Sequence, residues 1–445
     1  MTTVITYGTY DLLHYGHIRL LERAKALGDM LIVGVTSDDF DKTRGKLNVQ
    51  QSLAERIESV RQTGLADKII VEEYEGQKID DIQRYGVDIF TVGSDWVGKF
   101  DYLNDYCRVV YLDRTEGISS TQLRSADRKL RLGLIGTADI LKKYVDQSAA
   151  VNGIEITGIF SKTGAEEVFA GTDVPILDDM DAVIGQSDAV YIVSPAAEHA
   201  AAVRKALDAG KHVLCESPIA LTQAECRSLF ALAEEKHLVL MDAIKTAYSQ
   251  AYARMLLLAK VGKIGEVVSV DAACTSLKNK KAFWRSKGSM GEWGPTTLLP
   301  VFDLLGTQVK SSRFVTLFSK TEQGEDLFTK IELTYPQAVA TLKVGEGVKA
   351  EGELIIAGTK GYIYVPAPWW KTEYFEIRYE NPADNRRYFY QLDGEGIRYQ
   401  LIVFLKAIRG GRCLSYISPE VSEAISGTLE KFIRRQDFVE ISFGK

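Results

Sequence analysis

The strongest constraint on the fold is an alternation between short apolar runs and amphipathic segments, which occurs twice along the chain. The first series spans residues 4–124 and the second spans residues 131–245. An apolar run of four to eight residues suits a buried strand, and the amphipathic segment after it suits a helix that covers the sheet. The pattern therefore predicts two α/β units in series, each with a parallel sheet covered on both faces.

The pattern changes after about residue 245. A segment with a helical pattern is followed by several strand-like runs between residues 266 and 365. The segments after these runs again have a helical pattern. Such runs predict an α+β domain with a large, mostly antiparallel open sheet. The length of 445 residues allows about three folding units. We expect domains at 1–125, 131–245 and 246–445, with a charged linker at 126–130.

Composition and charge exclude several classes of function. Lys and Arg total 54 against 60 Asp and Glu, so the net charge of −6 provides no basic field for polymeric nucleic acid or an anionic membrane. The five cysteines show neither a disulfide framework nor zinc-ligand spacing. The first residues do not resemble a signal peptide, and no apolar run reaches the roughly 20 residues that span a bilayer. We expect a cytoplasmic protein without membrane insertion.

The residues with most chemical potential lie near the N-terminus. An expected strand ends at Tyr7, and a helix is expected to begin near His17, three residues after His14. The free N–H groups and positive dipole end of a helix start favour an anion such as phosphate. Taken alone, the two histidines also fit an ordinary helix start or half of a metal site.

The surrounding sequence resembles the glycerol-3-phosphate cytidylyltransferase family. The family's HxGH motif is present at residues 14–17, and its second hallmark, RTxGISST, is present at residues 114–121. Residues 44–46 and 93–96 agree with the family in order and spacing. The resemblance covers nearly all of residues 1–125 and implies transfer of a cytidylyl group from CTP to a phosphate acceptor.

The resemblance also implies roles for individual residues. Phosphoryl transfer needs cations and N–H donors around the phosphates, with little covalent work for the protein. The expected catalytic residues are His14, His17, Lys46 and Arg114. The expected nucleotide-binding residues are Thr9, Tyr10, Gly16, Asp95, Gly117, Ile118, Ser119 and Thr121. We expect Mg²⁺ to bridge the phosphates, with Asp11 as the nearest carboxylate.

Three side chains of this region keep two interpretations. Asp11 either binds Mg²⁺ or caps its loop. Arg56 either belongs to the nucleotide site or lies on a solvated helix face. Trp96 either stacks on cytosine or packs against other side chains of the domain. The favoured acceptor is glycerol 3-phosphate, which would give CDP-glycerol and pyrophosphate for a cell-surface polymer of the wall or capsule. Other polyol phosphates remain open.

Residues 130–440 resemble the Gfo/Idh/MocA oxidoreductases, named for glucose-fructose oxidoreductase and inositol dehydrogenase. The agreement is carried by residues 132–140, 188–221, 262–267 and 352–365. Members pair a Rossmann domain with an open-faced α/β domain. The implied dinucleotide-binding residues are Gly136, Thr137, Ala138, Ser161, Lys162, Ser194 and Glu216. Lys162, with no acidic residue after the second strand, favours NADP over NAD.

The second block departs from its family at the catalytic positions. Ala138 replaces a glycine that lets the backbone approach the pyrophosphate, and Ser217 replaces the lysine of the Glu-Lys-Pro motif. Thr296 and Pro300 replace the aspartate and histidine that exchange a proton with substrate.

Two interpretations of this block remain open. It is either an NADP-dependent reductase that makes the polyol phosphate acceptor, with Lys245 or Tyr248 donating the proton, or a degenerate scaffold used for binding or oligomerisation. In either case we expect a homo-oligomer.

Overall fold

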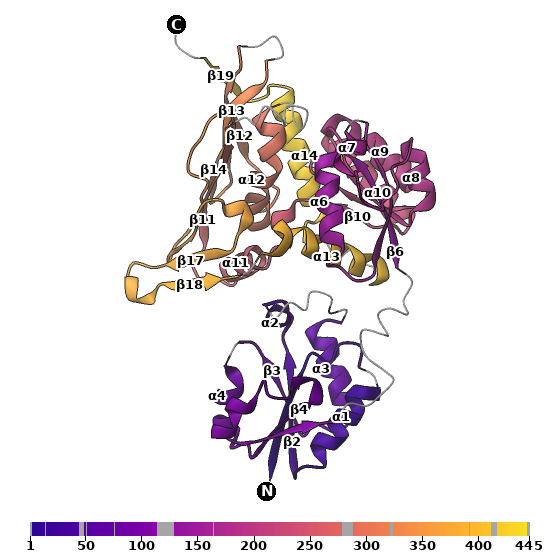
Figure 1. Cartoon of the computed structure of the whole chain (residues 1–445). Helices are drawn as coiled ribbons and strands as arrows, with labels where there is room; N and C mark the ends of the chain where they lie inside the picture. Colours follow the sequence, from indigo (N-terminus) through magenta and orange to yellow (C-terminus); the bar gives the residue numbers. More distant parts are fainter. Residues whose placement is uncertain are drawn as a thin grey trace. The chain divides into compact units, whose positions relative to one another are not determined.

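The computed structural model describes residues 2–13, 15–43, 49, 51–74, 76–113, 129–162, 164–277, 288–320, 324–390, 392–410 and 416–442. The chain divides into two compact units, Met1–Lys129 and Leu130–Lys445 (Figure 1).

The first unit is built on a parallel five-stranded sheet with strand order β3-β2-β1-β4-β5. The strands are β1 (Thr3–Gly8), β2 (Met30–Thr36), β3 (Lys68–Glu72), β4 (Ile89–Gly93) and β5 (Arg108–Leu112). The helices are α1 (Tyr15–Lys25), α2 (Asp38–Thr43), α3 (Leu53–Gln62) and α4 (Gln77–Tyr85), with 3₁₀ turns η1 (Ser94–Trp96) and η2 (Asp101–Asp105).

Both faces of this sheet are covered. Leu21 of α1 and Val60 of α3 pack on one face, where they join Val33 of β2 in one buried cluster. Ile82 of α4 packs on the other face against Phe90 of β4, and Figure 1 shows α4 opposite α1 and α3. The alternation of apolar runs predicted this covered parallel sheet, and the prediction is confirmed.

The second unit begins with another parallel sheet, of order β10-β9-β8-β6-β7. Its strands are β6 (Leu130–Gly136), β7 (Ile154–Phe160), β8 (Ala189–Val193), β9 (His212–Cys215) and β10 (Leu240–Asp242). Its helices are α6 (Ala138–Ser148), α7 (Ala165–Val168), α8 (Met180–Gln186), α9 (Ala196–Asp208) and α10 (Gln223–Glu235).

The rest of the second unit contains a nine-stranded sheet of order β18-β17-β16-β15-β11-β14-β13-β12-β19. Its strands are β11 (Val267–Ser276), β12 (Ser311–Phe318), β13 (Asp326–Thr334), β14 (Val339–Glu346), β15 (Leu354–Gly358), β16 (Tyr362–Val365), β17 (Tyr374–Arg378), β18 (Arg386–Phe389) and β19 (Phe438–Ile441). Its helices and 3₁₀ turns are η3 (Lys245–Tyr248), α11 (Gln250–Lys260), α12 (Ser289–Leu305), η5 (Trp369–Lys371), η6 (Pro382–Asp384), η7 (Asp393–Gly396), α13 (Ile397–Gly410) and α14 (Pro419–Ile433).

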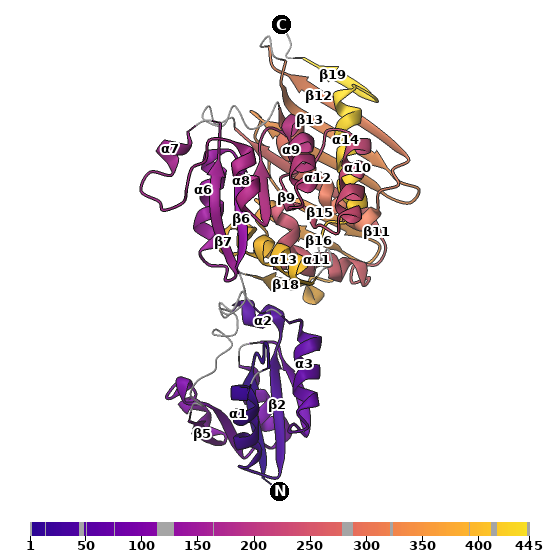
Figure 2. The same cartoon turned by 90° about the vertical axis from the view of Figure 1, so that its right-hand side faces the viewer.

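Helix α12 packs on strands β11, β13 and β14, and α14 packs on both α12 and α10. Figures 1 and 2 show these helices along one face of the large sheet. Most strand pairs are antiparallel, but β11 pairs with β14 and β12 pairs with β19 in parallel. The predicted α/β class with a mostly antiparallel third sheet is therefore confirmed.

A buried carboxylate fixes the start of α12. The Asp326 carboxylate accepts a hydrogen bond of 2.8 Å from the backbone N–H of Met290, in the first turn of the helix. A Cβ on Gly288 would lie 1.6 Å from the same carboxylate, so only glycine fits before the helix. Strand β13 thus determines where α12 begins.

Within the described residues, we find no helix with the length and apolar character that crossing a membrane would require.

Candidate active sites

The loop after β1 lies at the point where the sheet of the first unit changes direction. Strands β1 and β4 are neighbours, and the chain proceeds outward from them to both edges of the sheet. In open parallel sheets, ligands bind in the crevice at the carboxyl ends of such a strand pair. The loop at residues 9–13 and the turn Ser94–Trp96 follow these two strands.

The β1–α1 loop contains backbone strain. Tyr10 and Leu12 have φ values of 53° and 47°, a region that side chains other than glycine seldom adopt. Such strain persists only where the surroundings enforce it, and it is concentrated at functional sites. The Tyr10 side chain is 2% exposed, and burial raises the pKa of its hydroxyl. Its ring meets the ring of His17 edge-on, with centroids 5.6 Å apart.

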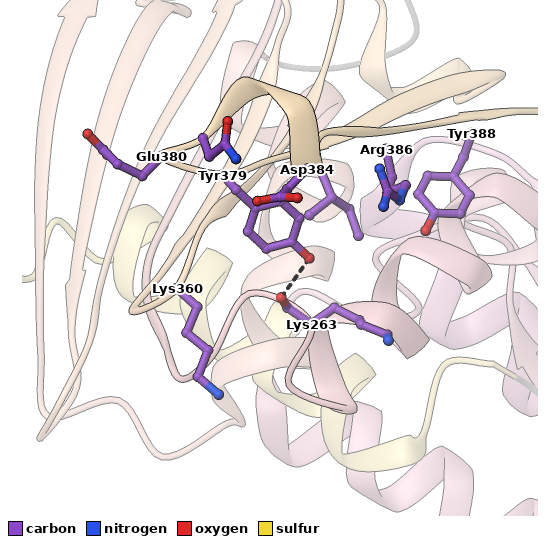
Figure 3. Close-up of a pocket in the computed structure, with 9 residues that line it drawn as sticks. Lys263, Lys360, Tyr379, Glu380, Asp384, Arg386 and Tyr388 are labelled. Carbon is purple, nitrogen blue, oxygen red and sulfur yellow. Dashed lines mark hydrogen bonds between the residues drawn. The ribbon is translucent and has the colours of Figure 1, made fainter.

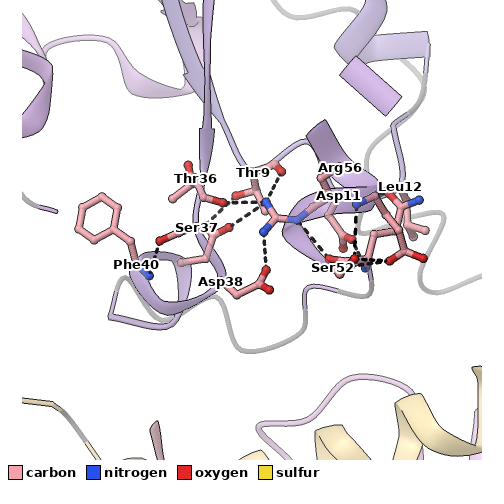
Figure 4. A network of polar contacts seen from close by, with 12 residues as sticks. Thr9, Asp11, Leu12, Thr36, Ser37, Asp38, Phe40, Ser52 and Arg56 are labelled. Atoms are coloured by element: carbon pink, nitrogen blue, oxygen red, sulfur yellow. Dashed lines mark hydrogen bonds and ion pairs between the residues drawn. The ribbon is translucent and has the colours of Figure 1, made fainter. Parts of the chain in front are cut away.

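Arg56 holds the strained loop in place. Its guanidinium is fully buried, and Nη1 donates hydrogen bonds to the carbonyl oxygens of Thr9 at 2.6 Å and Thr36 at 2.8 Å. Nε donates to the carbonyl oxygen of Gln51 at 3.1 Å, and Nη2 forms an ion pair with Asp38 (Figure 4). Arg56 is therefore a buried clamp between β1, β2 and α3, and the interpretation as a solvated helix face is wrong.

Asp11 is part of the same clamp. One carboxylate oxygen accepts a hydrogen bond of 2.9 Å from the backbone N–H of Gln51, and the Gln51 side chain accepts one of 2.8 Å from Leu12 N–H. Thr9 is anchored from its other side, because its hydroxyl donates to Asp41 at 2.7 Å. These contacts give Asp11 a role in holding the loop, which is the capping interpretation.

Several predicted site residues lie outside the described residues. They are His14, Lys46, Arg114, Gly117, Ile118, Ser119 and Thr121. Of the others, Gly16 lies in the first turn of α1, and Asp95 is exposed in η1. Trp96 is half-buried and packs against the cluster on the α4 face, with its ring 5.8 Å from Phe100 and the Lys99 amine 5.1 Å from its centroid.

Sequence reasoning missed a buried polar cluster at the carboxyl end of β1. The Tyr7 hydroxyl donates to Asp81 at 2.8 Å, and burial together with this carboxylate raises the pKa of Tyr7. Lys78 forms an ion pair with Glu72, and its amine lies 4.7 Å from the Tyr7 ring centroid. Charged side chains are usually assigned to the surface, so the sequence alone gave no reason to place these together.

In the second unit, the loop between β6 and α6 keeps the backbone of a dinucleotide site. Gly136 has a φ of 134°, and a Cβ there would lie 2.1 Å from the carbonyl oxygen of Val193. The N–H of Thr137 donates to that same oxygen at 3.0 Å. Helix α6 starts at Ala138, which is 4% exposed, and Asp139 beside it is exposed. The tight turn and helix N-terminus that bind a pyrophosphate are thus present, although Ala138 fills space that glycine leaves open.

The other predicted dinucleotide-binding side chains include residues that follow β7 and β8, the two strands that pair with β6. Ser161 and Lys162 follow β7, and the Lys162 amine lies 2.8 Å from both oxygens of the Glu198 carboxylate. Ser194 follows β8, and its buried hydroxyl has no hydrogen-bond partner among the described residues. An orphaned buried hydroxyl fits a site that a polar ligand completes.

The altered Glu-Ser-Pro motif belongs to a buried polar network. Glu216 accepts a hydrogen bond of 2.6 Å from the Tyr191 hydroxyl. Ser217 donates to Asp242 at 3.2 Å, and Ser422 of α14 donates to the same carboxylate oxygen at 2.9 Å. Burial raises the pKa of Asp242 to about 7. In place of a lysine that contacts substrate, this chain has a serine bonded to a buried carboxyl group.

The proposed proton donors of the second unit have different surroundings. The Tyr248 hydroxyl is buried and donates a 2.6 Å hydrogen bond to the carbonyl oxygen of Asp242, which commits its proton. Lys245 is half-buried at the start of η3. On α12, Trp293 precedes Thr296 by three residues, which puts both on one side of the helix. The Trp293 ring lies 5.0 Å from that of Trp370, an aromatic pair that sequence reasoning missed.

No group of three or more His, Cys, Asp or Glu side chains suited to a metal ion is found in the part of the chain that the structure describes.

The parallel sheet and the β1–α1 loop of the first unit are those of a nucleotidyltransferase. Comparison with known protein families agrees with this assignment. Residues 5–126 match the family described as "Cytidylyltransferase-like". Residues 130–243 match the family described as "Oxidoreductase family, NAD-binding Rossmann fold". The chain is thus an N-terminal cytidylyltransferase domain fused to a Gfo/Idh/MocA oxidoreductase domain, as the two resemblances predicted.

Among relatives, a glycerol-3-phosphate cytidylyltransferase from Bacillus spizizenii is 50% identical over 124 residues, which are 28% of this chain and 95% of the relative. A glycerol-3-phosphate cytidylyltransferase from Staphylococcus aureus is 48% identical over 126 residues, 28% of this chain and 93% of the relative. Through its first unit the chain belongs to the glycerol-3-phosphate cytidylyltransferase family, and it is a nucleotidyltransferase.

The second unit has more distant relatives. A dTDP-3,4-didehydro-2,6-dideoxy-alpha-D-glucose 3-reductase from Streptomyces violaceoruber is 36% identical over 156 residues, which are 33% of this chain and 45% of the relative. The 3-ketoreductase KijD10 from Actinomadura kijaniata, solved with NADP and TDP-benzene, superposes with a TM-score of 0.62 at 20% identity and covers 71% of this chain and all of that structure. At this identity the structural match shows the fold.

Proposed function

We propose that the first unit transfers the cytidylyl group of CTP to a polyol phosphate, with glycerol 3-phosphate as the favoured acceptor. The products are a CDP-alcohol, CDP-glycerol in the favoured case, and pyrophosphate. The observation that carries this proposal is the strained β1–α1 loop held by Arg56 at the switch point of the sheet. It lies in a chain that over 124 residues is 50% identical to a glycerol-3-phosphate cytidylyltransferase.

The roles proposed for the site follow from charge. His14 and His17 stabilise negative charge on the transferred and leaving phosphoryl oxygens, and Lys46 approaches the α-phosphate or the acceptor phosphate. Arg114 with the backbone and hydroxyls of residues 117–121 holds the β and γ phosphates. Thr9, Tyr10, Gly16 and Asp95 surround the nucleotide. Mg²⁺ supplies charge neutralisation between phosphates when bound.

The proposal is tested by an acceptor panel. Full-length protein is incubated with CTP and Mg²⁺ and with glycerol 3-phosphate, glycerol 2-phosphate or a four- or five-carbon polyol phosphate, and CDP-alcohol formation is measured. We expect the highest kcat/KM with glycerol 3-phosphate. A higher value for a longer polyol would change the acceptor and keep the reaction class. We also propose a cytoplasmic location and a role in supplying a cell-surface polymer.

A second function is proposed for the second unit: reduction of a carbonyl group with NADPH. The supporting observation is the retained Gly136 turn beside the orphaned Ser194 hydroxyl. NADPH would supply the hydride, and Lys245 would supply the proton to the carbonyl oxygen. Gly136 and Thr137 would approach the pyrophosphate, and Lys162 would meet the 2′-phosphate after leaving Glu198.

The substrate of this second reaction has two candidates. A keto phosphate would be reduced before cytidylyl transfer, which makes the acceptor. The names of the relatives instead include dTDP- and UDP-linked sugars, so a CDP-linked ketone would be reduced after transfer. NADPH oxidation with each of the two substrates separates them. Absence of NADPH binding would leave the scaffold interpretation. With either interpretation we expect a homo-oligomer.

We propose the domain limits 1–125, 131–245 and 246–445, with the linker at 126–130. Limited proteolysis checks them, because cleavage should fall first in the proposed linker at residues 126–130.

A further inference from the structure

A hollow of about 640 Å³ lies at one end of the nine-stranded sheet of the second unit. Strands β17 and β18 and the turn η6 between them form one side, and the turns that follow α11 and β15 form the other. Figure 3 shows the hollow with Tyr379 between Lys263 and Lys360. None of its lining residues belongs to residues 131–245, so it is separate from the proposed dinucleotide site.

The backbone around this hollow is fixed by hydrogen bonds. The N–H of Lys360 donates to the carbonyl oxygen of Ile264 at 2.9 Å, which joins the two turns. The Tyr379 hydroxyl donates to the carbonyl oxygen of Lys263 at 3.0 Å, which ties the β17–β18 connection to the same turns. A Cβ on Gly358 would lie 2.2 Å from the Ile264 carbonyl oxygen, so the turns are in close contact. The lining side chains therefore extend from a backbone that is already fixed, so ligand binding does not have to order it.

The cations at this hollow are available. Lys263, Lys360 and Arg386 form no ion pair with any residue that the structure describes, and all three are exposed. Elsewhere on the same strands the opposite holds, because Arg378 and Arg387 both form ion pairs with Glu376, at 2.5 and 3.3 Å. At this end of the sheet, two arginines thus share one carboxylate partner, whereas the three cations around the hollow have no ion-pair partner among the described residues.

The remaining lining groups restrict the ligand. Asp384 and Glu380 are also lining residues, and their carboxylates are able to accept hydrogen bonds from the hydroxyl groups of a ligand. Tyr379 and Tyr388 offer half-buried aromatic faces beside the cations. An inorganic anion would meet both carboxylates without using the rings, whereas a phosphate ester of a polyol or nucleoside brings hydroxyl groups for the carboxylates, and a nucleoside also brings a base for the aromatic faces. The volume is within the 300–1,000 Å³ typical of small-molecule sites.

We propose that this hollow binds an organic phosphate that bears hydroxyl groups, the chemical class of polyol phosphates and CDP-alcohols. The phosphate would be bound by Lys263, Lys360 and Arg386, and the hydroxyls by Asp384. Because these ligands are also substrates or products proposed for the first unit, the second unit would sense or retain them at a site of its own. The binding does not require cytidylyl transfer to occur.

Calorimetry on the full-length protein tests the proposal by counting sites. The probes are CDP-glycerol, CMP, glycerol 3-phosphate and inorganic phosphate. We expect two CDP-glycerol sites per chain in the wild type, and loss of at least tenfold in affinity at one of them in the double variant Lys263→Ala, Lys360→Ala. The matched control removes two exposed lysines away from the hollow, Lys343 on β14 and Lys310 just before β12, in the double variant Lys310→Ala, Lys343→Ala, and should keep both sites.

Three results would overturn the proposal. A single site in the wild type excludes it, and an equal loss of affinity in the control double variant means a non-specific charge effect. Inorganic phosphate that competes as well as CDP-glycerol means an anion site without hydroxyl recognition. Cytidylyl transfer by the Lys263→Ala, Lys360→Ala variant should equal that of the wild type, so failure of the proposed transferase reaction and failure of this site are distinguished. Thermal melting confirms that both variants fold.

Discussion

The hydroxyl of Ser422 on α14 donates a 2.9 Å hydrogen bond to the carboxylate of Asp242 at the end of β10. This contact joins the Rossmann sheet of the second unit to a helix that packs on the large sheet. Ser217, at the position of the family's lysine, donates to the same oxygen. The serine that replaces the family's lysine therefore shares a buried partner with α14, the helix that packs beside the Rossmann sheet.

The Asp242 network predicts a pH dependence of stability. Burial raises the pKa of Asp242 from 3.8 to about 7, and Glu216 adds to the shift. The folded state therefore holds a proton that the unfolded state releases, so this stability is full below about pH 4 and is lost as pH rises through 7. Asp242→Asn should reduce the decline in the unfolding midpoint between about pH 4 and 7, most clearly between pH 6 and 7. Asp303 and Asp326, each with a pKa raised to about 6, act at lower pH.

The control for this experiment is Asp139→Asn, which changes an exposed carboxylate. It should keep the wild-type profile. If Asp242→Asn also keeps that profile, the assignment of the pH dependence to Asp242 is wrong.

A second prediction concerns Arg56. Arg56→Lys removes the fork that bonds Thr9 and Thr36 and leaves Asp38 without its guanidinium partner, so the free energy of unfolding of the first unit should fall by about 3 kcal/mol. Urea unfolding measures the loss. CTP affinity should fall at least tenfold, because the β1–α1 loop loses its anchor. Arg61→Lys, on the same helix but 63% exposed, should change stability by less than about 0.5 kcal/mol. Equal effects of the two variants would contradict the clamp.

A third prediction concerns the HxGH motif. His14→Ala and His17→Ala should each lower kcat by about 10² or more, because each removes a positioned donor for charge that develops on phosphoryl oxygens. Steady-state pyrophosphate release measures the effect. His237→Asn replaces an exposed histidine of the second unit and should leave kcat unchanged. Near-wild-type turnover by either motif variant is incompatible with the proposed role.

A fourth prediction concerns cofactor preference in the second unit. Glu198 binds the Lys162 amine at 2.8 Å and so competes with a 2′-phosphate for it. Glu198→Gln should tighten NADPH binding and leave NADH binding unchanged, whereas Lys162→Ala should weaken NADPH binding alone. Fluorescence titration of each nucleotide measures both. If both variants bind NADPH as the wild type does, Lys162 does not read the 2′-phosphate.

The sequence was sufficient to predict those strands and helices that a run of neighbouring residues identifies. The buried runs that became β1, β2, β4, β6 and β8 are apolar over five to seven residues and are flanked by amphipathic helices, so their periodicity determines both type and pairing mode. Strand β18 contains two arginines and an exposed Phe389, and β19 is largely exposed. Neither has the alternation that identifies a strand, because each lies near or at a sheet edge.

The site was predictable only in part, for a physical reason. Residues of the HxGH loop are contiguous, so a motif identifies them. The loop's anchor is not contiguous: Arg56 lies 47 residues after Thr9, and it is buried because three backbone carbonyls from separate segments converge on it. Such convergence depends on the tertiary fold, and the sequence left two interpretations of the same arginine open, one of them a solvated helix face.

The central claim is tested most directly by phosphorus NMR of the full-length protein with CTP, Mg²⁺ and glycerol 3-phosphate. The account predicts that the CTP signals are replaced by the two diphosphate signals of CDP-glycerol and by pyrophosphate in equal amounts. It also predicts that His17→Ala lowers the rate of formation of both products by about 10²-fold. CTP that stays intact with glycerol 3-phosphate and with every other polyol phosphate, under conditions where the protein is folded, would contradict it.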